Sequence, residues 1–277
     1  MLVRELGRGG CGRTYLAFDP RSSEVVAAKV LHLDSVYAPE QRKLILDSSR
    51  RELETAARLR HPGFARVRAM GTDPDGTSYV ISDFVRGRNL RASMQPGGEA
   101  NECEVVRMIA LIAHSLATLH EAGLVHRDLK PENVLVVQRP LGAFPVLIDF
   151  GLAQDALFTP ETSNFIEGTL EYMSPEQGRG LRADGRSDVY SLGVIAFEWL
   201  TGERPLQGAA AASKGFFQRL FRPDRASIAA QRPALNRELA HLIDSMLALE
   251  PPSRPTAQVV ATACDAWLGA ARPRVEA

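Results

Sequence analysis

The sequence predicts an α+β fold of two lobes, a small antiparallel-β N-lobe with one helix and a larger α-helical C-lobe. Two observations support this prediction. Up to about residue 86, short β-branched segments alternate with glycine and turn residues, which is typical of an antiparallel sheet. After Gly87, apolar residues recur at helical spacing over long segments. The change of pattern places the boundary between the lobes near residue 86.

The N-lobe is expected to contain strands at residues 2–6, 14–18, 25–33 and 78–85. The first two strands flank a glycine cluster at residues 7–12, and the third is rich in β-branched residues. Residues 73–76, with the sequence Asp-Pro-Asp-Gly, are a turn signal between two strands. One helix is predicted between these strands, over roughly residues 40–59.

Caps and apolar stripes predict the helices of the C-lobe. The first helix begins after Asn101, which with Glu104 resembles a capping box, and it ends at Gly123. Residues 187–200 are apolar on nearly all sides, so we expect a buried central helix there. Two more helices are predicted at residues 239–249, before a Pro-Pro pair, and at residues 259–268.

Composition excludes several classes of protein. The 277 residues carry 33 basic and 33 acidic side chains, so neither a nucleic-acid footprint nor a polybasic membrane patch is expected. The three cysteines, Cys11, Cys103 and Cys264, are widely spaced and fit neither a disulfide framework nor a zinc site, which favours the cytoplasm. The most apolar stretch, residues 189–200, is too short to span a bilayer, so no membrane segment is expected.

Two strings carry the chemistry: residues 126–133, which read His-Arg-Asp-Leu-Lys-Pro-Glu-Asn, and residues 149–151, which read Asp-Phe-Gly. The first offers a proton-accepting carboxylate, an ammonium and an amide oxygen in one loop. The second offers a carboxylate for a hard cation. With these strings the chain resembles the protein kinases. The lysine two residues after the aspartate, Lys130, is similar to the pattern of the Ser/Thr type of that family.

The resemblance implies a role for each of these residues. Asp128 would orient the substrate hydroxyl and accept its proton, and Lys130 would neutralise charge on the γ-phosphoryl group. Asn133 and Asp149 would hold Mg²⁺, or Mn²⁺ in its place. Phe150 would pack under the helix of the N-lobe. A purely structural Asp128, as a cap or an ion-pair acid, would not account for the whole string.

The glycine cluster resembles the loop that covers the phosphates of ATP. Glycines let the backbone N–H groups approach a polyphosphate, but the same spacing occurs in dinucleotide folds, where a helix follows. Here residues 13–17 read as a strand, which favours the kinase form; a glycine hairpin without a ligand is the alternative. The nucleotide-binding residues expected in this part of the chain are Leu6, Gly7, Arg8, Gly9, Gly10, Cys11, Gly12, Thr14 and Ala27.

Lys29 resembles the strand lysine that holds the α- and β-phosphates of ATP, and the resemblance implies an acidic partner on the following helix. We expect Glu52 in that role; Glu54, about 200° further around the helix, should face elsewhere. The segment between the lobes would bind adenine. The remaining nucleotide-binding candidates are Ser82, Asp83, Val85 and Leu135.

Residues 168–176 resemble the substrate-docking segment of the family, in which Thr169 would hydrogen-bond near Asp128. Glu176 is expected to pair with Arg254 in a buried, architectural ion pair. Asp188 would bind the backbone of the catalytic loop and so serve as a scaffold residue.

The arginine at the position of Arg127 often binds an activation-loop phosphate in this family. The candidates for phosphorylation are Thr159, Thr162 and Ser163, and the acidic Glu161 could partly replace a phosphate. A loop whose hydroxyls only aid solubility is the alternative.

The resemblance covers nearly the whole chain and implies an ATP-dependent Ser/Thr protein kinase with autophosphorylation. The expected kinase domain covers residues 1–270, with the N-lobe at 1–86, the C-lobe at 87–270 and a tail at 271–277. Its expected partners are protein substrates and, for phosphorylation in trans, a second copy of the chain. The rival hypotheses are an ATP-binding pseudokinase acting as a scaffold and a kinase-like small-molecule phosphotransferase.

Overall fold

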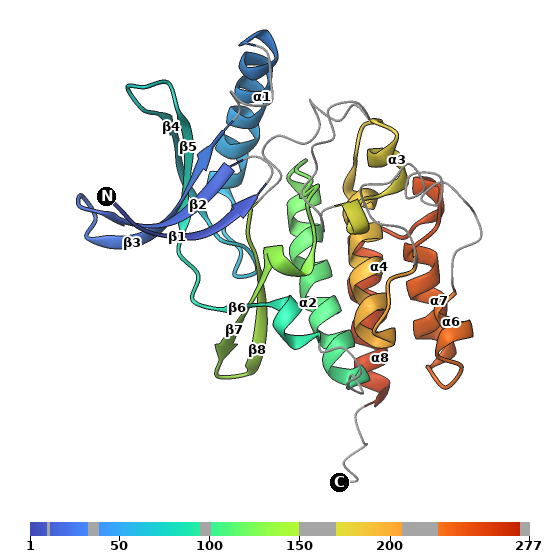
Figure 1. The fold of residues 1–277 in the computed structure, drawn as a ribbon. Coiled ribbons are helices and arrows are strands. Elements are labelled where there is room, and N and C mark those ends of the chain that lie inside the picture. Colours follow the sequence, from blue (N-terminus) through green and yellow to red (C-terminus); the bar gives the residue numbers. More distant parts are fainter. Residues whose placement is uncertain (10–11, 33–38, 95–100, 150–169, 207–226, 272–277) are drawn as a thin grey trace.

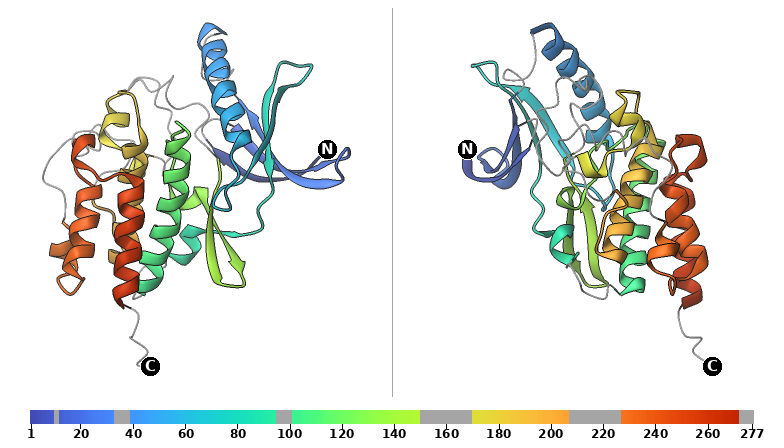
Figure 2. Two further views of the ribbon diagram at one scale, coloured as in Figure 1. Left: turned by 180° about the vertical axis from the view of Figure 1, so that it is seen from behind. Right: turned by 45° about the vertical axis from the view of Figure 1, so that its right-hand side comes forward.

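The computed structural model describes residues 1–9, 12–32, 39–94, 101–149, 170–206 and 227–271 (Figure 1). A twisted sheet with one helix beside it forms the N-lobe, and a group of helices forms the C-lobe. The ribbon seen from behind and the ribbon turned by 45° show the same two-part arrangement (Figure 2). The α+β fold predicted from the sequence is therefore confirmed.

The N-lobe sheet has the strand order β1-β2-β3-β5-β4, and every pair of neighbouring strands is antiparallel. The alternation of buried and exposed residues in β3 explains why this segment forms a strand, since one face packs inward. The strands and the helix of this lobe are β1 (Leu2–Gly9), β2 (Gly12–Asp19), β3 (Glu24–Leu31), α1 (Pro39–Arg58), β4 (Val67–Thr72) and β5 (Ser78–Asp83).

The C-lobe begins with a small sheet of order β6-β7-β8 that the sequence reading missed. Its strands are β6 (Arg88–Asn89), β7 (Val134–Arg139) and β8 (Gly142–Leu147). β6 has two residues, too few to show any periodicity. The helical elements are η1 (Leu90–Ser93), α2 (Glu102–Glu121), η2 (Pro131–Asn133), η3 (Leu170–Tyr172), α3 (Pro175–Gly178), α4 (Gly185–Thr201), α6 (Ile228–Gln231), α7 (Arg237–Met246), η4 (Pro251–Ser253) and α8 (Ala257–Ala271).

The predicted caps of α2 are where the sequence placed them. The side chain of Asn101 accepts a hydrogen bond from the backbone N–H of Glu104, which caps α2. Gly123 has a φ of 74°, the left-handed conformation that ends a helix and favours glycine. α4 begins two residues earlier than expected, because Asp184 caps it and forms a reciprocal capping box with Ser187.

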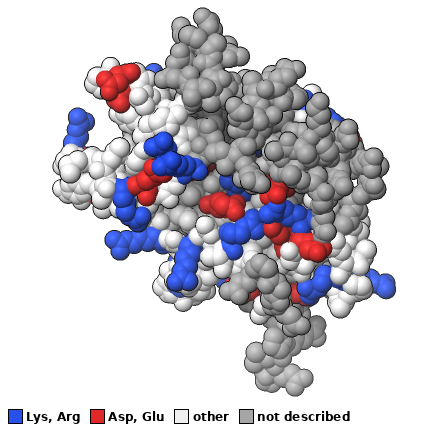
Figure 3. Space-filling view, in the orientation of Figure 1, with Lys and Arg blue, Asp and Glu red and all other residues white. Residues whose placement is uncertain are grey.

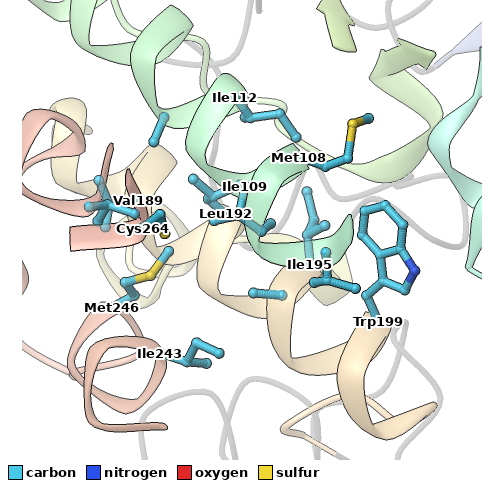
Figure 4. Packing of buried hydrophobic residues seen from close by; sticks show 14 of the residues in the cluster. Met108, Ile109, Ile112, Val189, Leu192, Ile195, Trp199, Ile243, Met246 and Cys264 are labelled. Atoms are coloured by element: carbon cyan, nitrogen blue, oxygen red, sulfur yellow. The ribbon is translucent and has the colours of Figure 1, made fainter. Parts of the chain in front are cut away.

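The main hydrophobic core lies between α2, α4, α7 and α8. Ile109 and Ile112 of α2 meet Leu192 and Ile195 of α4, with Met246 of α7 on the other side (Figure 4). These five side chains are 4% exposed or less, and complete burial of one such side chain contributes about 1.5–3 kcal/mol. The core therefore fixes α4, the helix that carries several residues of the site.

A second, smaller cluster joins the two lobes. Leu53 and Ala56 of α1 pack with Val67 of β4 and Val80 of β5, and Leu119 of α2 and Leu124, which follows α2, complete the cluster. This contact fixes the position of α1, and therefore of Glu52, relative to the catalytic loop.

Among the described residues, α2 is the one helix long and apolar enough to be a candidate membrane span. Of its apolar window, 61% is buried inside the protein, and the core helix of a folded domain passes the same test. This helix, rather than residues 189–200, is therefore the candidate, and one largely buried helix of this kind gives only weak support for a membrane span.

Candidate active site

The loop between α2 and β7 brings three predicted residues into contact. Lys130 Nζ donates hydrogen bonds to both carboxylate oxygens of Asp128, at 3.0 and 2.9 Å. Asn133 Nδ2 lies 2.8 Å from the carbonyl oxygen of Asp128 and 2.9 Å from its Oδ2. The Asp128 carboxylate is therefore oriented from two sides by groups of its own loop.

Asp188, at the start of α4, holds this loop by its backbone. Its carboxylate is 1% exposed and accepts hydrogen bonds from the backbone N–H groups of His126 and Arg127, both at 2.8 Å. His120 Nε2 lies 2.8 Å from Asp188 Oδ2. Burial alone would raise the pKa of Asp188, but the hydrogen bond and charge of His120 outweigh it and keep the pKa below its usual value.

The same loop also contains a strained backbone conformation. Arg127 has a φ of 64°, in the left-handed region that few non-glycine residues adopt. Gln177 of α3 helps to hold this conformation, because its Nε2 donates a 2.8 Å hydrogen bond to the Arg127 carbonyl oxygen. Gln177 and His120 were missed by the sequence reasoning; Gln177 directly follows the Glu176 of the docking segment, which could have drawn attention to it.

Asp149 lies beside the catalytic loop at the end of β8. The backbone N–H of Ile148 donates to the carbonyl oxygen of Asn133 at 2.9 Å, so the two expected metal ligands come from adjacent chain segments. Asp149 itself has a left-handed φ of 56°. Lys29 Nζ, on β3 of the other lobe, lies 3.5 Å from Asp149 Oδ2.

The donor set at Asn133 and Asp149 suits a hard divalent cation. Asn133 uses its amide nitrogen on Asp128, so its amide oxygen is the ligand it can offer, and Asp149 offers a carboxylate. In the described part of the chain, no group of three His, Cys, Asp or Glu residues could hold a metal ion. Two protein ligands are what Mg²⁺ commonly takes when phosphate oxygens and water complete its shell.

Glu52 lies at the interface of the lobes, but its partner is not the expected one. Its two carboxylate oxygens accept hydrogen bonds from Arg127 Nη1 and Nη2, at 2.7 and 3.0 Å. The structure thus places Glu52 against Arg127, while it places Lys29 against Asp149. The planar guanidinium fork matches a carboxylate with two parallel hydrogen bonds, which a lysine ammonium does not do.

The strands around the glycine loop bring the expected nucleotide-binding residues of the N-lobe together. In the β2–β3 register Thr14 is opposite Lys29, and in the β3–β5 register Ala27 is opposite Ser82. A Cβ on Gly12 would lie 2.0 Å from the carbonyl oxygen of Val30, so this position requires glycine. Of the other candidates, Leu6, Gly7, Arg8 and Gly9 lie on β1, Asp83 ends β5, and Leu135 lies on β7.

The segment between the lobes is held by an ion pair. Arg68 on β4 donates from Nε to the carboxylate of Asp83 and from Nη1 to that of Glu24. Val85 follows Asp83 by two residues and is partly buried. The end of β5, where adenine is expected, is therefore tied to the neighbouring strands.

Glu176 and Arg254 form the buried ion pair that the sequence suggested. Arg254 Nη1 and Nη2 lie 2.7 and 2.8 Å from the two carboxylate oxygens of Glu176, and Ser187 Oγ also donates to this carboxylate at 2.6 Å. Burial would raise the pKa of Glu176, but Arg254 outweighs it and holds the pKa below its usual value. The pair joins the docking segment to the segment that precedes α8.

Several predicted residues lie outside the described residues. They are Gly10, Cys11, Phe150, Thr159, Thr162, Ser163 and Thr169. Their roles stay predictions.

A two-lobed fold with a glycine loop, a strand lysine, and an Asp-Lys-Asn loop beside a second aspartate defines a protein kinase domain. The sequence model of the family described as "Protein kinase domain" matches residues 1–265. The chain therefore belongs to the protein kinase family.

Known bacterial relatives agree with this assignment. The chain is 33% identical over 264 residues to the serine/threonine-protein kinase pkn3 of Myxococcus xanthus, a match that covers 90% of this chain and 46% of the relative. It is 36% identical over 215 residues to the serine/threonine-protein kinase PknA of Mycobacterium tuberculosis, covering 76% of this chain and 48% of the relative. It is 35% identical over 256 residues to the serine/threonine-protein kinase Pkn1 of Myxococcus xanthus, a match that covers 91% of this chain and 36% of the relative. The chain thus spans between a third and a half of the length of these relatives.

Proposed function

We propose that this chain transfers the γ-phosphoryl group of ATP to Ser or Thr hydroxyl groups of proteins. The observation that carries the proposal is the Asp128 carboxylate, held between Lys130 and Asn133 on a loop that is anchored by Asp188. The names of the bacterial relatives support the Ser/Thr class. Residues 168–176 resemble the substrate-docking segment of the family and so favour a protein substrate over a small molecule.

In the proposed mechanism, Asp128 orients the acceptor hydroxyl and takes its proton as the new P–O bond forms and the bond to ADP breaks. Lys130 neutralises the charge that develops on the transferred group. Lys29 binds the other phosphates of ATP. Asn133 and Asp149 would hold Mg²⁺, which would supply positive charge against the negative charge of the phosphates. Positioning and electrostatics therefore carry the rate enhancement.

We also propose that the Glu52–Arg127 pair belongs to a resting arrangement. A phosphate on the loop at Thr159, Thr162 or Ser163 would compete with Glu52 for Arg127 and release Glu52 toward Lys29. The proposal further includes phosphorylation in trans by a second copy of the chain. It also includes Mg²⁺ as the metal in preference to Mn²⁺ and a cytoplasmic location.

The experiment that tests the proposed function is transfer from labelled ATP, with Mg²⁺ and with Mn²⁺ in parallel. The wild type is compared with Asp128→Asn, on the protein itself and on a generic protein substrate, and the labelled sites are mapped by mass spectrometry. We expect label on Ser and Thr in the wild type and its loss, by about a hundredfold or more, in Asp128→Asn. Nucleotide binding without transfer in the wild type would instead favour a scaffold.

A further inference from the structure

A group of charged side chains beside the catalytic loop has no part in the mechanism above. It joins four segments far apart in the sequence: η1, the catalytic loop, η3 and the end of α4 with the residues that follow. We call it the Arg91 cluster, and it consists of Arg91, Glu132, Glu171, Tyr172, Glu198 and Arg204.

Arg91 is the centre of the cluster, because its guanidinium meets three different groups. Nε lies 2.9 Å from Glu132 Oε1, Nη1 lies 2.9 Å from Glu198 Oε1, and Nη2 donates to the hydroxyl of Tyr172. The guanidinium carbon is also 5.7 Å from the centre of the Tyr172 ring. An arginine from another molecule would bind such a site through the same donors and the same planar stacking.

The cluster is acidic apart from its own arginines. Burial raises the pKa of Tyr172, so its phenol stays neutral and donates to Glu198. Arg204 contacts Glu198 and Glu171 from the other side. Three carboxylates therefore face two guanidinium groups, and removal of Arg91 would leave two excess negative charges instead of one.

The Arg91 cluster includes residues of the two segments that are expected to contact the substrate. Glu132 lies in the catalytic loop, four residues after Asp128 and directly before Asn133. Tyr172 lies in the docking segment, three residues before Pro175, which begins α3. The Arg91 side chain is 32% exposed and that of Glu132 is 44% exposed, so a peptide that crosses this face can reach the site.

We propose that Arg91 is a specificity-determining residue: it fills, from within the chain, the acidic site between Glu132 and Glu198, and so excludes arginine and lysine of a protein substrate from the surface beside Asp128. A basic substrate side chain would have to displace Arg91 or lie against its charge. Neutral and acidic segments meet no such penalty. The inference rests on the proposed kinase activity.

The first part of the test uses the wild type alone. The assay compares peptides that contain one Thr acceptor. In each set, one position within five residues of the acceptor is varied and carries Arg, Ala or Glu. We expect arginine to raise kcat/KM by no more than about twofold over alanine at any position. A clear wild-type preference for arginine at any position would overturn the proposal, and this part needs no folded variant.

The second part uses Arg91→Met, which keeps the length and the apolar stem of the side chain. We expect a new preference for arginine over alanine, by about five- to tenfold in kcat/KM, at one or two positions. The preference should disappear in the double variant Arg91→Met with Glu198→Gln, because one of the two carboxylates that flank the acidic site is then neutral. Arg237→Met, at an exposed arginine that begins α7, is the matched control and should keep the wild-type pattern.

The outcomes separate this inference from the proposed function. Transfer to alanine peptides by a folded Arg91→Met protein, without a gain for arginine, would overturn the inference alone. No transfer to any peptide or to the protein itself, in any variant, would overturn the proposed function. A gain for arginine that survives Glu198→Gln would show that Arg91 acts in another way and would also overturn the inference.

Discussion

At the scale of single residues, the site depends on charges that are held by more than one neighbour. Asp128, Asp188 and Glu176 each accept at least two hydrogen bonds from the chain. A carboxylate held in this way keeps one orientation, which a phosphoryl-transfer site requires. In a buried ion pair such as Glu176–Arg254, removal of one side chain is costly, because the remaining side chain is left buried and charged.

Glu52 and Glu54 offer a matched pair of substitutions on α1. Glu52 contacts Arg127 and is proposed to meet Lys29 in the reacting state, whereas Glu54 is exposed and lies 3.9 Å from Arg50. We expect Glu52→Gln to lower kcat for peptide phosphorylation by about tenfold or more and Glu54→Gln to leave it within about twofold. Steady-state assays at saturating ATP measure both. A higher kcat in Glu52→Gln would show instead that the pair with Arg127 only restrains the enzyme.

The Glu176–Arg254 pair predicts a particular dependence of stability on pH. Because the folded chain holds the pKa of Glu176 below the ordinary value of 4.5, the pair stabilises fully above that pH and loses its contribution as the pH falls through the lowered pKa. At pH 7 we expect Glu176→Gln to reduce the free energy of unfolding by about 3–5 kcal/mol, since Arg254 stays buried without its counter-charge. The difference from the wild type should shrink in acid.

Urea unfolding at a series of pH values from neutral to acid measures this dependence. Glu250→Gln is the control, because Glu250 is exposed and lies 3.9 Å from Arg179, a pair expected to contribute less than about 1 kcal/mol. Wild-type and Glu176→Gln curves that stay parallel down to the lowest pH would contradict the prediction.

At the scale of elements, α4 organises the site. Asp188 at its start binds the catalytic loop, Ser187 binds Glu176, and Ser191 donates to the carbonyl oxygen of Tyr172 in the docking segment. Glu198, near its end, holds Arg91. One buried helix therefore sets the relative position of the catalytic loop and the docking segment, and its packing matters for activity as well as stability.

Close packing of α4 on α7 can be tested at Gly193. A Cβ at this position would lie 2.9 Å from Met246 Cβ and 3.2 Å from Leu247 Cδ2, so α7 would have to shift. We expect Gly193→Ala to destabilise the protein by about 1–3 kcal/mol in chemical unfolding. Gly269→Ala, on α8 with nothing within 4 Å of the new Cβ, should be neutral or stabilise by up to about 1 kcal/mol. Equal effects at the two positions would contradict the packing argument.

At the scale of the whole molecule, the nucleotide is expected between two lobes that several groups of contacts join. These are the cluster around Leu53 and Leu119, the Glu52–Arg127 and Lys29–Asp149 pairs, and the backbone hydrogen bonds of Leu147 to Gly63 and Ala65. Among the described residues that Figure 3 colours, charged side chains of both signs are mixed over this face. A ligand that contacts both lobes should stabilise the whole protein through specific contacts.

Thermal unfolding with ATP tests the proposed metal site at this scale. We expect Mg²⁺ with ATP to raise the Tm more than ATP with a chelator does, since the metal adds contacts between the phosphates and Asn133 and Asp149. Asp149→Asn should remove the metal-dependent part of the increase, while Asp75→Asn, in the exposed β4–β5 turn, should retain it. A metal-dependent increase that persists in Asp149→Asn would place the metal elsewhere.

Features that depend on neighbours along the chain follow from the amino-acid order alone. The α2 stripe and its cap at Asn101, the glycine loop, and the Asp128–Lys130–Asn133 loop are each encoded within about twenty residues. Local spacing sets helix and strand periodicity, and it also sets the order of groups within a loop. These features could therefore be predicted before any contact was known.

Which distant charges meet depends on the packing of the folded chain. Glu52 and Arg127 are 75 residues apart, and Arg91 and Glu198 are 107 apart, so no spacing in the sequence relates them. The partner of Glu52 depends on how α1 packs against the end of α2, and the Arg91 cluster depends on four segments that the C-lobe core brings together. A charged side chain takes the partner that the packing of apolar surfaces places beside it, and that packing is a property of the whole fold.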